Sequence, residues 1–141
     1  MSGRSLIALV DAFTAGTLPK AEWTHEAHLR VGAWHVQQHG ASAALPLLRS
    51  RIRALNERHG TINSATGGYH ETITAAYVQL IDVFLAQAPV DVDVDTRAAL
   101  LLASPLADRS VLFRYWSRAR LLSPEARAAW LPPDLAPLTS G

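Results

Sequence analysis

Hydrophobic residues recur every three or four positions along most of the chain, a spacing typical of amphipathic helices. The first such stretch starts after Ser5, a good N-cap residue, and stops at Gly16. The second starts after Thr24, another good cap, and ends at Gly40. Applied to the whole chain, this spacing predicts helices over residues 5–15, 25–40, 45–59, 70–88, 96–103, 108–120 and 123–130.

The segments between these helices carry loop signals. Residues 61–68 are rich in Thr, Asn, Ser and Gly, and residues 131–141 contain three prolines, which predicts an extended C-terminal tail that packs through Leu135 and Leu138. Residues 90–95 alternate Val and Asp, the period of a strand, but nothing else in the chain offers a partner strand. We therefore interpret them as an extended connection. The prediction is one all-α domain over 1–141, a compact antiparallel bundle of five to seven helices without significant sheet.

Composition narrows the class of protein. With 141 residues, 49% apolar and 18% charged, the chain has the size and composition of one globular domain. The low charged fraction leaves room for a homo-oligomer interface. A net charge of +1 does not favour nucleic acid or an acidic membrane, and the N-terminus lacks the features of a leader peptide. The absence of cysteine excludes disulfides and thiolate metal sites and fits a reducing compartment, so we expect a cytoplasmic protein.

Histidines supply the candidate chemistry of the second predicted helix. On a helical wheel of about 100° per residue, Glu26 and Arg30 mark the solvent face. His28 points away from that face, and His25 lies about 60° from His28 on the same buried side. Both imidazoles fall near the start of the helix. There the helix dipole and burial both lower the pKa of imidazole, which favours the neutral form.

The fourth predicted helix repeats this arrangement. His70 continues its apolar stripe one turn toward the N-terminus, with Tyr69 before it and Glu71 on its flank. A carboxylate at a helix start is stabilised as an anion and could orient a histidine. We therefore predict a pocket between the starts of these two helices, with His28, His70 and Glu71 as candidate catalytic residues and with His25 and Tyr69 as ligand contacts. The remaining histidines, His35, His39 and His59, are interpreted as structural.

Two kinds of site are consistent with this set of histidines. In the first, His25, His28 and His70 bind a divalent metal such as zinc or iron, because His-x-x-His on one helix face can place two nitrogens on one ion. In the second, a pocket without metal uses neutral histidines as acids, bases or hydrogen-bonding groups. The spacing matches neither His-Glu-x-x-His nor the paired Glu-x-x-His of di-iron bundles, so both alternatives stay open.

A second polar cluster lies in the predicted helix 108–120. Three arginines alternate there with aromatic residues, and Arg114 and Arg118 are four positions apart. On one helix they would lie one turn apart and could bind a carboxylate or phosphate together. The alternative is a solvated helix face.

Three stretches of the chain resemble a family of small bacterial proteins. They are Trp23-Thr24-His25-Glu26-Ala27-His28-Leu29, Gly68-Tyr69-His70-Glu71-Thr72-Ile73-Thr74 and the segment 113–138 with its Arg-Leu-Leu-Ser-Pro-Glu-Ala-Arg run. The resemblance implies no activity, cofactor or catalytic residue.

The residues themselves therefore carry the functional hypothesis. We expect a small enzyme or ligand-binding domain whose histidine-lined pocket takes a small polar metabolite, with hydrolysis or proton transfer as the reaction. The alternative is a non-catalytic homodimer in which the histidines only satisfy buried polar contacts.

Overall fold

A computed structural model describes residues 4–138 of the chain. Its first helix, α1 (Leu6–Ala15), begins and ends where the sequence predicts. The Ser5 hydroxyl accepts the Ala8 N–H over 3.3 Å, and Gly16 ends the helix with a left-handed φ of 75°. The apolar stripe of α1 is buried, so this helix packs one face on the core and leaves the other in solvent. A short 3-10 turn, η1 (Lys20–Glu22), leads to the next helix.

Helix α2 (His25–Arg58) consists of two helical segments joined directly at Gly40. Thr24 caps the first segment as predicted, accepting the Ala27 N–H over 3.2 Å. Gly40 has φ 80° and ψ 160°, a conformation reserved for glycine, so the helix changes direction there. The predicted break over 41–44 is wrong, because this Ala-rich stretch is helical and Ala44 is fully buried.

Helices α3 (Glu71–Gln87) and α4 (Val94–Leu102) follow the polar loop. Helix α3 is the predicted fourth helix. Helix α4 starts two residues earlier than predicted, because the Asp93 carboxylate accepts the Thr96 N–H over 2.8 Å and caps it. Within residues 4–138 there is no strand, and residues 90–93 form a turn that connects α3 to α4. The predicted extended connection over 90–95 is wrong for Val94 and Asp95, which begin α4.

The predicted helix over 108–120 is wrong. The chain forms instead two 3-10 turns, η2 (Pro105–Ala107) and η3 (Val111–Arg114), and a short helix, α5 (Arg118–Leu121). Ser117 interrupts the helix: its backbone N–H and its hydroxyl both donate to the Asp134 carboxylate, at 2.8 and 2.7 Å, and its own backbone is extended. Helix α6 (Pro124–Ala128) follows, capped by Ser123 as predicted but ending two residues early.

The C-terminal tail packs on this short-helix region. Leu138 is buried, as expected, whereas Leu135 is exposed and contributes only its backbone N–H, which donates to the Tyr115 carbonyl over 2.9 Å. The indole N–H of the fully buried Trp116 donates to the Leu131 carbonyl over 2.9 Å. Backbone groups of the tail thus bind the segment just before α5.

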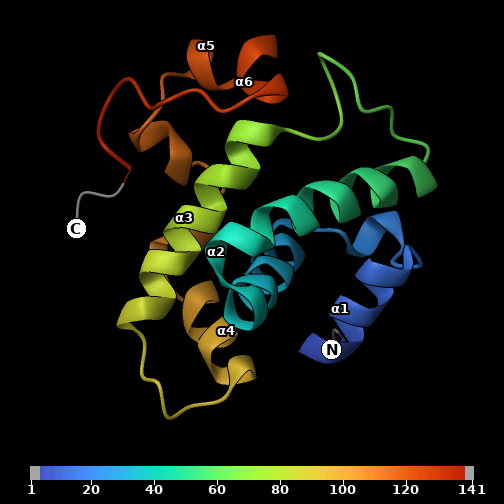
Figure 1. Ribbon diagram of the computed structural model, residues 1–141, viewed down its shortest axis with the longest axis vertical. Helices are drawn as coiled ribbons and strands as arrows, with labels where there is room; N and C mark the ends of the chain where they lie inside the picture. Colours follow the sequence, from blue (N-terminus) through green and yellow to red (C-terminus); the bar gives the residue numbers. More distant parts are fainter. Residues whose placement is uncertain (1–3, 139–141) are drawn as a thin grey trace.

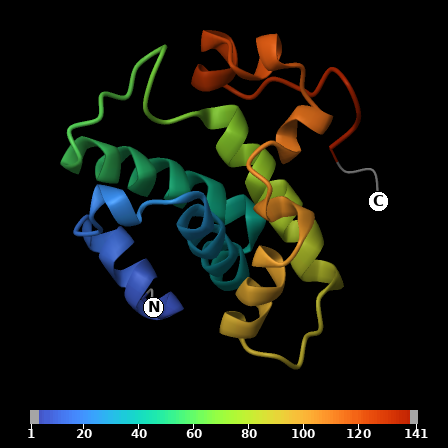
Figure 2. The same cartoon turned by 180° about the vertical axis from the view of Figure 1, so that it is seen from behind.

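Helix α2 lies at the centre of the fold, with α1 on one side and α3 and α4 on the other (Figures 1 and 2). Helices α5 and α6 lie beyond the N-terminal end of α3, far along the chain from it (Figure 1). The core has two parts: a large cluster from α1, α2, α3 and α4, and a smaller cluster around Trp116 that includes Leu112 and Leu121. The all-α prediction is confirmed. None of the helices in residues 4–138 has the length and apolarity that crossing a bilayer requires.

Candidate functional site

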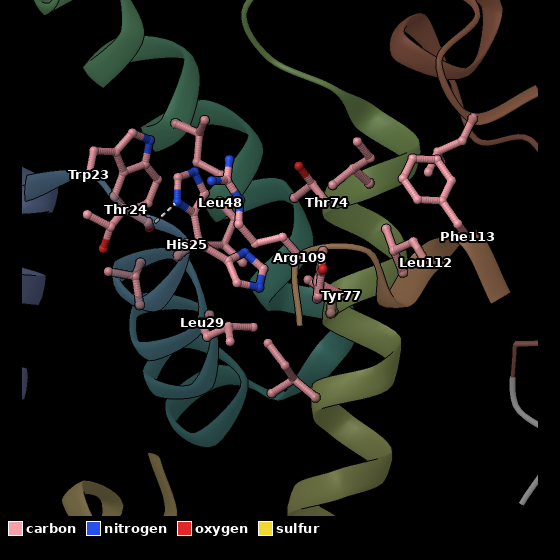
Figure 3. Close-up of a pocket in the computed structure, with 18 of the residues that line it drawn as sticks. Trp23, Thr24, His25, Leu29, Leu48, Thr74, Tyr77, Arg109, Leu112 and Phe113 are labelled. Atoms are coloured by element: carbon pink, nitrogen blue, oxygen red, sulfur yellow. Dashed lines mark hydrogen bonds between the residues drawn. The ribbon is translucent and has the colours of Figure 1, made fainter. Parts of the chain in front are cut away.

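A cavity of about 470 Å³ lies between the two parts of the core. Its volume falls within the range typical of small-molecule sites. The first turn of α2 and the first half of α3 form two of its walls, and the η3 region and α5 form another (Figure 3). The side chains that line it are mostly apolar, and the polar ones are Thr24, His25, His28, Thr74, Tyr77 and Arg109, with Trp23 beside them.

Gly32 of α2 lies where α2 and α3 come close together along the cavity wall. A Cβ at Gly32 of α2 would lie only 3.0 Å from the Ile81 Cδ1 of α3, and both residues line the cavity. The two helices therefore approach each other more closely than a larger residue would allow. The first turns of α2 and α3 both contribute to the lining, through His25 and His28 and through Ile73 and Thr74.

His28 is the best-oriented polar group in the cavity. Its Nδ1 lies 2.6 Å from the carbonyl oxygen of Thr24, which can only accept, so Nδ1 carries the proton (dashed line in Figure 3). The imidazole stacks on the Trp23 indole with ring centroids 3.6 Å apart. Nε2 has no hydrogen-bond partner among residues 4–138 and is left as an acceptor. The ring position and tautomer of His28 are therefore both fixed before any ligand binds.

The environment of His28 disfavours its protonation. The side chain keeps exposed surface, but the ring itself is packed among protein atoms, including the stacked Trp23 indole. This burial lowers the pKa of His28 to about 4, with smaller contributions from the positive charges of His25 and Arg109. The bond to Thr24 opposes the shift but does not outweigh it. His28 is accordingly a neutral hydrogen-bond acceptor near pH 7.

His25 and Tyr77 lie next to each other in the cavity wall. The His25 Nε2 donates to the Leu106 carbonyl over 3.2 Å, which anchors the η2 turn to the start of α2. Its ring meets the Tyr77 ring edge to face at 5.6 Å. The Tyr77 hydroxyl makes no hydrogen bond within the described part of the chain. Burial raises the pKa of Tyr77 to about 12, so this hydroxyl stays protonated and can donate to a ligand.

Arg109 is the one formally charged side chain among the described residues that line the cavity. It comes from the segment between η2 and η3 and lies between the α2 wall and the α3 wall (Figure 3). Its guanidinium has neither a hydrogen bond nor an ion pair within residues 4–138. The neighbouring Asp108 does not compensate it, because this carboxylate accepts the Ser110 N–H and hydroxyl, at 2.9 and 2.8 Å.

His70 does not line the cavity, which corrects the predicted role of this residue. It is the N-cap of α3: Nδ1 accepts the Ile73 N–H over 3.1 Å, and Nε2 donates to the Leu121 carbonyl over 2.7 Å. The side chain is buried, and both of its nitrogens are used. His70 therefore holds α3 to α5 and has no free atom for a ligand or metal.

Glu71 and Tyr69 are also engaged elsewhere. The Glu71 carboxylate binds the Arg49 guanidinium through two contacts, of 2.9 and 2.8 Å, and accepts the Tyr69 hydroxyl over 2.8 Å. Arg49 is the main reason why the pKa of Glu71 is lowered, and the Tyr69 bond adds to it. Neither Glu71 nor Tyr69 lines the cavity. This corrects their predicted catalytic and binding roles: they join α3 to the second segment of α2.

The predicted arginine pair does not form. Arg114 ends η3 and Arg118 begins α5, so the two residues do not lie on successive turns of one helix. The Arg118 guanidinium lies over the Phe113 ring, 4.8 Å from its centre, and both arginines are exposed outside the cavity. Both arginines are therefore solvent-exposed surface residues, as the alternative interpretation of this segment proposed.

The predicted metal ligands are not brought together. With His70 committed to the α3 cap, only His25 and His28 of that set face the cavity. Within residues 4–138, no group of three or more His, Asp or Glu side chains lies together where it could hold an ion. The residues present therefore fit a zinc or iron site poorly.

The other buried histidine is structural, as predicted. His35 is fully buried; Nδ1 donates to the Val31 carbonyl over 2.8 Å, and Nε2 accepts from Arg51 over 2.8 Å. His59 similarly donates to the Leu18 carbonyl over 2.7 Å.

Sequence reasoning missed three polar residues of the cavity. Tyr77 and Thr74 lie on the apolar side of α3, where a hydroxyl among apolar residues was a weak signal. Arg109 stands at the start of the predicted helix 108–120, and nothing in that segment singled it out from the other arginines.

Comparisons with protein-family models, with curated proteins and with solved structures gave no match to this chain.

Proposed function

We propose that this protein binds a small organic molecule in the cavity between α2, α3 and η3, with a polar group at His28. The observation that carries the proposal is the oriented imidazole. Trp23 and the Thr24 carbonyl fix its position and leave Nε2 as an acceptor facing the cavity. An acceptor that lines the cavity and has no partner among the described residues favours a ligand that supplies an O–H or N–H donor.

The lining refines the chemical class of the expected metabolite. Most of the cavity wall is aliphatic, from residues such as Leu29, Val78 and Leu112. Burying apolar ligand surface here contributes about 25 cal/mol per Å², whereas a polar group placed against this wall loses its hydration without compensation. The ligand that fits has a mostly apolar body with few polar groups.

A reaction at this site would use His28 as the proton acceptor, either from the ligand or from an attacking water. The free imidazole is a weak base, because its pKa lies near 4 and an efficient base has a pKa near the working pH. A proton-transfer or hydrolytic enzyme therefore requires a bound ligand whose negative charge raises the pKa of His28. Binding is the primary proposal, and catalysis depends on the charge of the ligand.

Location of the site can be tested with neutral probes. We expect 2-phenylethanol to bind and to shift the NMR resonances of His28 and Tyr77. Ile73→Trp fills the cavity and should abolish these shifts, because Ile73 lines it. Val83→Trp, on the exposed side of the same helix, is the matched control and should bind like the wild type. Equal binding by both variants, or no binding by the wild type, would contradict the proposal.

The role of His28 can be tested separately. His28→Phe keeps an aromatic ring against Trp23 but removes Nε2. In the wild type we expect 2-phenylethanol to bind about 5- to 10-fold more tightly than its methyl ether, which cannot donate a hydrogen bond. The variant should bind the two probes equally. A preference that survives in His28→Phe would remove His28 from the site.

A further inference from the structure

The positive charge of Arg109 indicates which kind of polar group the ligand carries. Arg109 lines the cavity, and no Asp or Glu does so among the described residues. The two histidines of the cavity cannot balance the positive charge of Arg109, because a histidine side chain is either neutral, as His28 is near pH 7, or positively charged. Arg109 is a solvent-exposed side chain, so water partly screens its charge, but it still attracts an anion that enters the cavity.

No carboxylate forms an ion pair with Arg109 within residues 4–138, although the exposed Asp108 lies close enough for its charge to help raise the pKa of Tyr77. Asp108, its neighbour in the chain, is held by Ser110 through two hydrogen bonds and lies outside the cavity lining. Glu71, at the start of α3, is paired with Arg49 and does not line the cavity. The guanidinium therefore keeps its five N–H donors for a group that enters the cavity.

We propose that the cavity selects a small monocarboxylic acid, whose carboxylate binds Arg109 while its apolar body lies against α3 and η3. This inference rests on the proposed ligand-binding function of the same cavity. It places the carboxylate at Arg109, so the donor that His28 Nε2 accepts is a separate O–H or N–H group or a water molecule. A planar guanidinium matches the two oxygens of a carboxylate. The Tyr77 hydroxyl, which is protonated and has no partner in residues 4–138, is a further donor in the cavity wall.

The single cation also sets the charge of the ligand. A phosphate monoester carries close to two negative charges at pH 7, and the cavity offers one positive side chain to balance them. The second charge would face an aliphatic wall, which is costly. A primary amine would bring a like charge against Arg109. The cavity therefore favours a monoanion over a dianion, a neutral molecule or a cation.

Three probes of one shape test this selection: 3-phenylpropanoate, 3-phenylpropan-1-ol and 3-phenylpropan-1-amine. Isothermal titration of the wild type should give about 10-fold tighter binding for the carboxylate than for the alcohol, with the protonated amine weakest. Arg109→Met should remove the preference for the carboxylate and leave the affinity for the alcohol within about 2-fold, since Met retains an apolar chain of similar length.

Arg114→Met is the matched control. It removes one positive charge from the adjacent 3-10 turn, η3, outside the cavity, and should retain the preference for the carboxylate. If both variants lose the preference equally, net charge explains it and the proposal is overturned. If Arg109→Met keeps the preference, the proposal is overturned as well.

The probes also separate this inference from the function on which it rests. Binding of the alcohol with no gain for the carboxylate would overturn the carboxylate site and leave the ligand-binding cavity intact. Failure of all three probes in the wild type would overturn both. Thermal unfolding followed by circular dichroism checks that both variants, which change exposed side chains, remain folded.

Discussion

The His70 imidazole donates through Nε2 to the backbone carbonyl of Leu121 over 2.7 Å, joining the start of α3 to the end of α5. The same ring caps α3, because Nδ1 accepts the Ile73 N–H. One neutral side chain thus satisfies two backbone groups in elements that lie 51 positions apart. Both bonds require the tautomer with hydrogen on Nε2, and protonation of Nδ1 would remove the cap acceptor.

The first prediction concerns this cap. His70→Ala should lower the free energy of unfolding by about 2–3 kcal/mol, because it removes a cap and leaves a buried carbonyl without a donor. His70→Asn restores a cap acceptor and should recover about 1 kcal/mol of that loss. Urea denaturation measures both variants. A His70→Ala protein as stable as the wild type would contradict the structural role of this residue.

The second prediction is that stability falls with decreasing pH below about 6.5. Burial lowers the pKa of His70 and lowers those of His28 and His35 to about 4, whereas in the unfolded chain they lie near 6.5. Between these values the unfolded chain binds more protons, so acid favours unfolding. Fully buried His35 alone should contribute a loss on the order of 3 kcal/mol by pH 4.

Carboxylates do not obscure this effect in the upper part of the range. Glu71, Asp93 and Asp134 have lowered pKa values, so their stabilising contributions are lost only below about pH 4.5. Urea midpoints at pH 7.5, 6.5, 5.75 and 5 isolate the histidines. His70→Asn, which lacks one of these groups, should show a shallower dependence. A stability that is constant from pH 6.5 to 5 would show that the histidines are not held neutral.

The third prediction concerns the pair of Glu71 and Arg49. The carboxylate side chain is 13% exposed and the guanidinium 41%, so the pair is only partly protected from solvent. A double-mutant cycle with Glu71→Gln and Arg49→Met should give a coupling energy of about 1 kcal/mol, since two contacts form and water screens part of the charge. Neither residue lines the cavity, so neither substitution should change probe affinity more than about 2-fold.

The fourth prediction compares two adjacent glycines before α3. Gly68 has φ 78°, and a Cβ there would lie 2.6 Å from the Ile62 carbonyl oxygen. Gly68→Ala should therefore cost about 2–3 kcal/mol, from left-handed backbone strain and from the contact. Gly67 has its nearest neighbour at 3.8 Å, so Gly67→Ala should change stability by less than about 0.5 kcal/mol. Equal effects of the two substitutions would contradict the loop conformation.

The sequence predicted the long helices well because the signals for them are local. Ser5, Thr24 and Gly16 act on the turn next to them, and their capping roles are those observed. The helix over 108–120 failed for a non-local reason. Asp134, 17 positions away, binds Ser117 and ends helical geometry there, and no periodicity in the segment itself records that contact.

The candidate site was predicted only in part, and the reason is geometric. The helical wheel gave the direction of His28 correctly because His28 lies inside α2. His70 instead has cap dihedrals of φ −131° and ψ 110°, so its side chain leaves the direction that the wheel assigns. Arg109 reaches the cavity from an irregular segment, where no period relates sequence position to direction.

The bend at Gly40 makes two walls of the cavity parts of one continuous stretch of chain. Leu29 and Gly32 come from the segment before it, and Leu48 and Ile52 from the segment after it. A methyl group at Gly40 would touch nothing within 4 Å, so any cost of adding one arises from the main chain alone. The distance between these two walls is therefore set by the backbone at Gly40, which does not itself line the cavity. A change of backbone angle there would alter the shape of the cavity without replacing any of its lining side chains.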